Sequence, residues 1–108
     1  MTNSLSFSPR LSPEYFIVIC EYKGEPYARE LDREQLTNRR TVVADIATGQ
    51  IEGVKRVLCA RIGEPLEDVT YDICCDIWEG RGSQWSVRGD VLDLLQEHLG
   101  VTSAWAVA

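Results

Sequence analysis

The apolar residues near the start of the chain predict a strand hairpin. The run from Tyr15 to Tyr22 is dense in β-branched and aromatic side chains, which is typical of a buried strand. Residues 23–26 contain one Gly and one Pro and predict a turn. The alternation over 27–31 then predicts a second strand that pairs back on the first.

A helix is predicted between residues 32 and 49. The Asp32 carboxylate can accept from the free N–H groups of a first turn, and Gln35 completes a capping box. Gly49 supplies a left-handed stop. Two arginines interrupt the apolar face, so the helix could instead begin near Thr37. The residues at helical spacing are Leu36, Val43, Ile46 and Ala47.

The segment 54–62 fits two periodicities. Helical spacing places Ile51, Val54, Leu58 and Ile62 on one stripe, whereas strand alternation separates two faces. The run of nine residues is bounded by Gly53 and by a second glycine at 63. This length and these boundaries favour a strand.

Two further helices are predicted in the last third of the chain. The first begins near Pro65, with Trp78 at the edge of its apolar stripe. A glycine-rich flexible connector follows at 80–86, and a second helix runs over 87–99 and ends at Gly100. Residues 101–108 alternate and could add a final strand anchored by Trp105. The stripe of the first helix is Leu66, Val69, Ile73 and Ile77, and that of the second is Val91, Leu94, Leu95 and either His98 or Leu99.

These elements predict one small α+β domain. Their order is β-β-α-β-α-α with a possible C-terminal strand, and we expect the helices to pack on one face of a small sheet. The 108 residues suit a single domain, which we place at 14–108. Residues 1–13 are rich in Ser and Pro, and we expect a mobile leader there.

The order of short motifs resembles a family of small uncharacterised bacterial proteins. The matching pieces are an aromatic-Gly turn (22–24), Arg-Glu-Leu-Asp (29–32), a helix that ends in Gly-Gln (41–50), Val-Lys-Arg-Val (54–57) and Asp-Val-x-x-Asp-Ile (68–73). The resemblance covers roughly residues 22–77. That family has no assigned activity, so the resemblance supports a fold and implies no catalytic residue.

Composition excludes several classes of protein. Apolar residues make up 44% and charged residues 26%, which excludes a disordered or collagen-like chain. The longest apolar run is far shorter than the roughly 20 residues that span a bilayer. No signal-like segment opens the chain, so we expect four reduced cysteines and a cytoplasmic location. The cysteines form no CxxC pair, and we expect neither a metal site nor a cofactor.

The net charge of −6 is unevenly distributed. The acidic total argues against a general nucleic-acid binder. Along the chain, residues 29–61 carry a net +2 and residues 64–98 a net −7. We expect an acidic helix face that binds a basic protein partner, as an inhibitor, immunity or adaptor protein would. The alternative is a solvated face that only maintains solubility. The acidic residues are Glu67, Asp68, Asp72, Asp76 and Glu79.

A basic patch is the second candidate surface. With Tyr22 or Tyr27 nearby, it could bind single-stranded nucleic acid by stacking and charge. The alternative is ion pairing with the domain's own acids at 30, 34, 45 and 52. The patch residues are Arg39, Arg40, Lys55 and Arg56.

An enzyme is the third possibility, and we nominate no catalytic residue. His98 is the one histidine, and near a helix end we expect it to satisfy the last carbonyls. Residues 80–82 follow a predicted helix instead of a strand, so they lack the geometry of a phosphate loop. A short sheet with Trp78, Trp85 and Trp105 could also leave an edge or apolar patch for self-association as a homo-oligomer.

Overall fold

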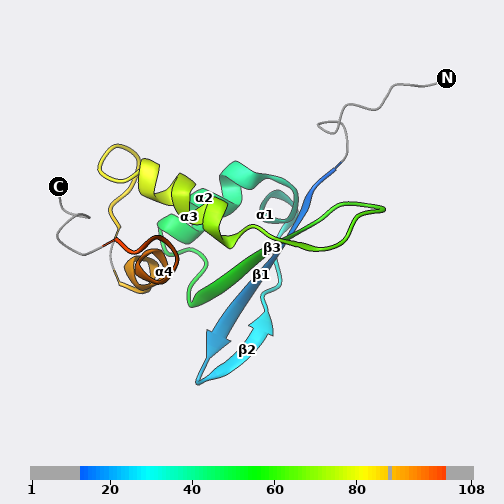
Figure 1. Ribbon diagram of the computed structural model, residues 1–108, viewed down its shortest axis with the longest axis horizontal. Coiled ribbons are helices and arrows are strands. Elements are labelled where there is room, and N and C mark those ends of the chain that lie inside the picture. Colours follow the sequence, from blue (N-terminus) through cyan, green and yellow to red (C-terminus); the bar gives the residue numbers. More distant parts are fainter. Residues whose placement is uncertain (1–12, 88, 102–108) are drawn as a thin grey trace.

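The computed structural model describes residues 13–87 and 89–101, which form an α+β domain (Figure 1). The leader before Pro13 and the predicted final strand with Trp105 lie outside the described residues. The strands pair antiparallel in the order β2-β1-β3-β4. They are β1 (Tyr15–Tyr22), β2 (Glu25–Ala28), β3 (Val54–Ala60) and β4 (Glu67–Asp68). The helices are α1 (Arg33–Thr37), α2 (Arg39–Ala47), α3 (Thr70–Glu79) and α4 (Asp90–Leu99).

The two long strands bury one face against the helices. In β1, Phe16, Val18 and Cys20 are at most 2% exposed. They lie opposite the buried residues of β3, with Phe16 beside Cys59 and Val18 beside Val57. The helices gather on one side of the sheet, as expected from the sequence (Figure 1).

A β-bulge at Lys55 explains why residues 54–62 fitted two periodicities. Ile19 lies opposite Arg56, yet the next residue, Cys20, lies opposite Val54, so Lys55 is the extra residue. The bulge turns the Val54 side chain to the same buried face as that of Val57. Two buried residues three positions apart are also what a helix would show, which is why the segment fitted both patterns. The strand prediction is confirmed, although β3 ends at Ala60.

The hairpin turn is tighter than predicted. Lys23 and Gly24 have φ angles of 52° and 80°, as a two-residue turn of the primed type requires. The strand therefore restarts at Glu25, and the predicted turn over 23–26 and strand over 27–31 are wrong in extent. Pro26 lies within β2, although proline has no backbone N–H to donate. An edge strand tolerates this, because the backbone groups on its outer side have no neighbouring strand to pair with.

The single helix predicted over 32–49 is two helices. The Asp32 capping box is confirmed, with Gln35 N donating to Asp32 Oδ1 at 2.9 Å. Asn38 then ends α1 in an extended conformation, and its side chain caps α2 by accepting from Thr41 N at 3.2 Å. Leu36 is therefore 36% exposed and outside the core. The stop at Gly49 is confirmed, with φ of 84°.

The last two helices begin later than predicted. Pro65 precedes β4, and α3 starts only at Thr70, which leaves Leu66 55% exposed. The remaining predicted apolar stripe of α3 is buried, together with Cys74. In α4 the predicted Val91, Leu94 and Leu95 are buried, whereas His98 and Leu99 are only partly buried. Gly100 ends the helix with φ of 72°.

The loop 80–86 is closed by hydrogen bonds and is not a free connector. Trp85 Nε1 donates to the Ile77 carbonyl at 2.8 Å, which folds the indole back over Gly80. Arg81 stacks 3.8 Å from the centre of the Trp78 ring and donates to its carbonyl. The loop therefore fixes Trp85 beside the C-terminal end of α3.

We predict that Gly80→Ala destabilises the domain by about 1–3 kcal/mol, because overpacking forces its neighbours to shift. A Cβ atom at this position would lie 2.4 Å from the Trp85 ring. Urea denaturation measures the loss. In a Trp85→Ala background the same substitution should cost much less, and an equal cost in both backgrounds would contradict the predicted clash.

Candidate functional site

The five predicted acidic residues do not form one helical stripe. Asp72, Asp76 and Glu79 lie on α3, spaced so that they share one side of it. Glu67 and Asp68 form β4 instead, so their assignment to the helix is wrong. The physical reason is that the chain pairs with β3 before it can turn into a helix.

Glu67 belongs to a cluster around Arg61. The Arg61 guanidinium donates to Glu67 at 3.0 Å and to Glu14 on the other side, and Glu64 lies 4.0 Å away. These contacts join the start of β1, the end of β3 and β4. Glu67 is therefore engaged in holding the sheet together. The sequence signal for this cluster is a lone arginine at the end of a strand, followed by acids at 64 and 67.

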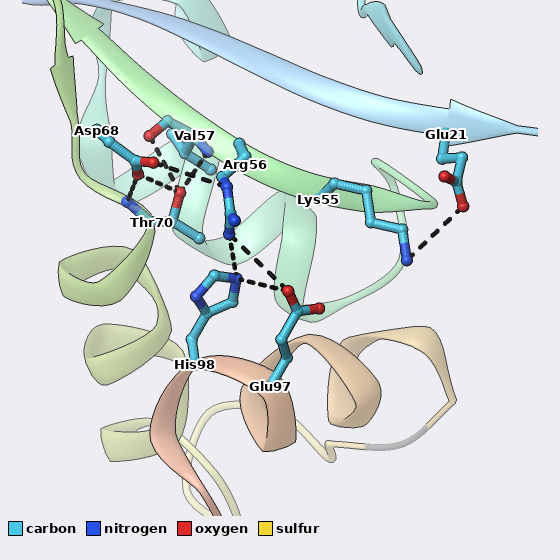
Figure 2. Close-up of polar contacts among 8 residues, drawn as sticks. All are labelled: Glu21, Lys55, Arg56, Val57, Asp68, Thr70, Glu97 and His98. Atoms are coloured by element: carbon cyan, nitrogen blue, oxygen red, sulfur yellow. Dashed lines mark hydrogen bonds and ion pairs between the residues drawn. The ribbon is translucent and has the colours of Figure 1, made fainter. Parts of the chain in front are cut away.

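Asp68 holds the junction between β4 and α3 (Figure 2). The Thr70 hydroxyl accepts from Val57 N at 2.9 Å and donates to Asp68 Oδ1 at 2.5 Å. The Thr70 amide also donates to the same oxygen at 2.9 Å. Arg56 lies 3.7 Å from the second Asp68 oxygen. The hydrogen bond from the Thr70 side chain is the main cause that lowers the pKa of Asp68 below its usual value.

Three of the four residues of the predicted basic patch are held by acids of the domain, and Arg40 has no ion pair in the described ranges. Arg39 reaches Asp76 at 2.9 Å, and Lys55 lies 3.8 Å from Glu21. Arg56 contacts Asp68, and it also lies 4.0 Å from Glu97 of α4. Ion pairing within the domain was the expected alternative, yet in the described ranges the partners are not the acids at 30, 34, 45 and 52. The two candidate surfaces partly neutralise each other.

His98 contacts Arg56 and does not take the predicted role at the end of its helix. Its Nε2 lies 2.8 Å from Arg56 Nη1 (Figure 2). An arginine can only donate, so Nε2 is the acceptor and the ring proton is on Nδ1. The contact ties the end of α4 to β3.

Asp76 and Glu79 of α3 border a hollow of about 510 Å³. Asp72 lies on the same side of the helix. Asp76 is ion-paired with Arg39, whereas Asp72 and Glu79 form no ion pair within residues 13–87 and 89–101. The hollow lies between α2, α3 and the loop 80–85. The sequence pattern did not predict it, because Trp85 lies in an irregular loop whose path no periodicity indicates. Its lining is Arg39, Arg40, Val43, Asp76, Glu79, Gly80, Gln84 and Trp85.

The four cysteines are free thiols, and three of them are buried. Burial raises the pKa of Cys20 and Cys59, and it raises the pKa of Cys74 to about 12. Cys75 is partly exposed, as expected for adjacent residues of a helix, which cannot both face the core. Among the described residues, no three metal-ligating side chains come together, and no helix is long and apolar enough to span a bilayer.

We predict that Asp68→Asn destabilises the protein most near neutral pH. The lowered pKa means that the charged carboxylate stabilises the folded state above about pH 4, and this contribution is lost as the pH falls further. Urea denaturation over a pH series should show the difference from wild type shrinking in acid. Thr70→Ser keeps the hydroxyl and should keep the pH dependence. A difference that does not change with pH would show that Asp68 carries no such interaction.

We also predict that a disulfide reagent labels one thiol of the four in the folded protein. Cys75 should react, because the other thiols are buried and protonated. Cys75→Ser should abolish the rapid phase in a spectrophotometric thiol assay. Rapid labelling of Cys75→Ser would mean that a buried thiol is accessible.

Comparisons with protein-family models, with curated proteins and with solved structures found no match.

Proposed function

We propose that this chain is a non-enzymatic protein-interaction module that binds a basic segment of a partner protein along α3. The binding residues would be Asp72, Asp76 and Glu79, which follow each other at one and two turns of the helix. An inhibitor, immunity protein or adaptor uses charge in this way to steer its partner. The four free thiols suit a cytoplasmic protein.

The observation that carries the proposal is that Glu79, which has no ion pair in the described ranges, borders the hollow, with Asp72 on the same side of α3. Asp72 and Glu79 are exposed and have no ion-pair partner in the described part of the chain, although Arg39 and Arg40 line the same hollow as Glu79. Glu79 also borders the hollow, whose lining includes Val43 and Trp85. A lysine or arginine of a partner could place its apolar stem against these two side chains and its charge beside Glu79.

The nucleic-acid alternative has weaker support. Arg39, Lys55 and Arg56 would each have to leave an acid at 2.9–3.8 Å before they could bind phosphate. Arg40 alone of the four has no ion pair within the described ranges, and one cation gives little affinity for a polyanion. Exposed Tyr22 and Tyr27 remain available for stacking, but they lie on the hairpin and not on α2.

A titration with a short lysine- and arginine-containing peptide tests the proposal. We expect binding at low salt that weakens as salt is added, and chemical-shift changes in the amides of α3 and of the loop 80–85. The double variant Asp72→Asn with Glu79→Gln should bind about three- to tenfold more weakly, because each exposed ion pair contributes at most about 1 kcal/mol.

The matched control is Glu52→Gln with Asp93→Asn, which removes the same charge from exposed positions elsewhere. It should bind the peptide as wild type does. Equal losses of peptide affinity in the two double variants would mean that binding depends on net charge alone, and would refute the α3 site. Binding of a single-stranded oligonucleotide that Arg40→Glu abolishes would favour the nucleic-acid alternative.

A further inference from the structure

The hollow beside α3 has two walls of opposite charge. The helices α2 and α3 lie side by side (Figure 1). Arg39 and Arg40 open α2 on one side of the hollow, and Asp76 and Glu79 lie in the last turn of α3 on the other. These four formal charges sum to zero on a protein whose net charge is −6. A partner segment with only positive charge would therefore meet a repulsive wall as well as an attractive one.

One ion pair crosses this hollow in the described part of the chain. Arg39 Nε donates to Asp76 Oδ2 at 2.9 Å and so joins the two helices. Arg40 and Glu79 are exposed and form no ion pair within residues 13–87 and 89–101. The neighbouring Arg81 stacks on the Trp78 ring and donates to the carbonyl of that residue. One positive and one negative side chain therefore line the same hollow from different helices.

The helix ends have the same polarity as the side chains on them. The first turn of α2 contains no acidic residue, and the last turn of α3 contains no basic residue. A helix begins with partial positive charge and ends with partial negative charge. Arg40 and Glu79 therefore add to the charge of their own helix ends instead of offsetting it. An acid near Arg40 and a base near Glu79 would each be attracted by the side chain and by the helix end.

The remaining wall of the hollow is apolar and held in place. Val43 and the Trp85 ring supply the apolar surface. The bond from Trp85 Nε1 to the Ile77 carbonyl and the bond from Gln84 N to the Gly80 carbonyl, both 2.8 Å, fix the loop. A preformed wall loses little conformational entropy when it binds a ligand. The volume of about 510 Å³ lies in the range of pockets that hold small ligands, so it can take two side chains of a peptide.

We propose that the partner segment carries both charges: a lysine or arginine that binds Glu79, and an aspartate or glutamate close to it in sequence that binds Arg40. The site is that of the proposed function, on which this inference rests. Packed helices lie about 8–10 Å apart, and alternate residues of an extended chain lie about 7 Å apart on one side of it. The simplest such segment is therefore extended, with one residue between the base and the acid.

Two blocked peptides that differ at one position test this. The first contains Arg-Ala-Glu and one further lysine, and the second contains Arg-Ala-Gln in the same context, so that its charge is more positive by one. Attraction to a protein of charge −6 would by itself favour the second peptide. We expect the reverse, with the glutamate peptide binding about two- to fivefold more tightly by calorimetry, as one exposed ion pair allows. It should also shift amides in the first turn of α2, which the glutamine peptide should leave unchanged.

Variants assign the two contacts. Arg40→Gln should remove the preference, so that the more positive glutamine peptide binds at least as tightly as the glutamate peptide. Glu79→Gln should weaken both peptides by a similar factor and keep the preference. The matched control is Arg33→Gln, which removes the same charge from an exposed position on α1 and should keep the preference. Thermal melts should show that each variant is folded.

The outcomes separate this inference from the proposed function. Wild type that binds the glutamine peptide at α3 as tightly as the glutamate peptide, or more tightly, overturns the need for an acid and leaves the basic contact intact. A preference for glutamate that persists in Arg40→Gln also overturns it, because the acid would then bind elsewhere. Failure of both peptides to shift the amides of α3 overturns the proposed function and this inference together.

Discussion

The Thr70 side chain closes the open edge of β3, and the arrangement of the acidic residues depends on this contact. Thr70 is 2% exposed, and its hydroxyl accepts the Val57 amide at 2.9 Å. The Val57 carbonyl accepts from Val69 N, also at 2.9 Å. Since β4 reaches only Leu58 and Cys59, no β4 residue lies opposite Val57 on this edge of β3. A buried backbone amide left without a partner costs about 1–3 kcal/mol.

This contact separates the acidic segment 67–79 into two parts with different roles. Residues before Thr70 are held in β4, where Glu67 pairs with Arg61 and Asp68 fixes the threonine hydroxyl. Residues after it turn into α3, where Asp72 and Glu79 face solvent and form no ion pair in the described ranges. The sheet and the interaction surface are therefore linked. Moving the start of α3 would change both the pairing of the strand acids and the direction of the helix acids.

Periodic burial made much of the fold predictable from the sequence. The β-branched and aromatic run that forms β1, the apolar stripe of α4 and the capping box at Asp32 all depend on residues close in sequence, and each was confirmed. The bulge at Lys55 was not predictable in this way, and the break at Asn38 was indicated only by the alternative helix start near Thr37. Both interrupt a regular period, and sequence patterns detect only the period.

The candidate sites were less predictable because their partners are distant in sequence. Thr70 binds a residue 13 positions away, and Arg39 pairs with Asp76 at a separation of 37. Net charge along the chain correctly separated an acidic third from a basic middle. It gave no information on which acids would meet which arginines, because that depends on how α2 packs on α3 and how β3 lies against α4.

Hydrogen exchange of the Val57 amide tests the role of Thr70 most directly. In wild type and in Thr70→Ser this amide should exchange as slowly as the central amides of β1, because a hydroxyl accepts it in both. In Thr70→Val it should exchange about tenfold faster or more relative to those amides, since a buried donor loses its acceptor. Unchanged protection of Val57 in Thr70→Val would contradict the conclusion that this threonine holds the junction of the sheet and α3.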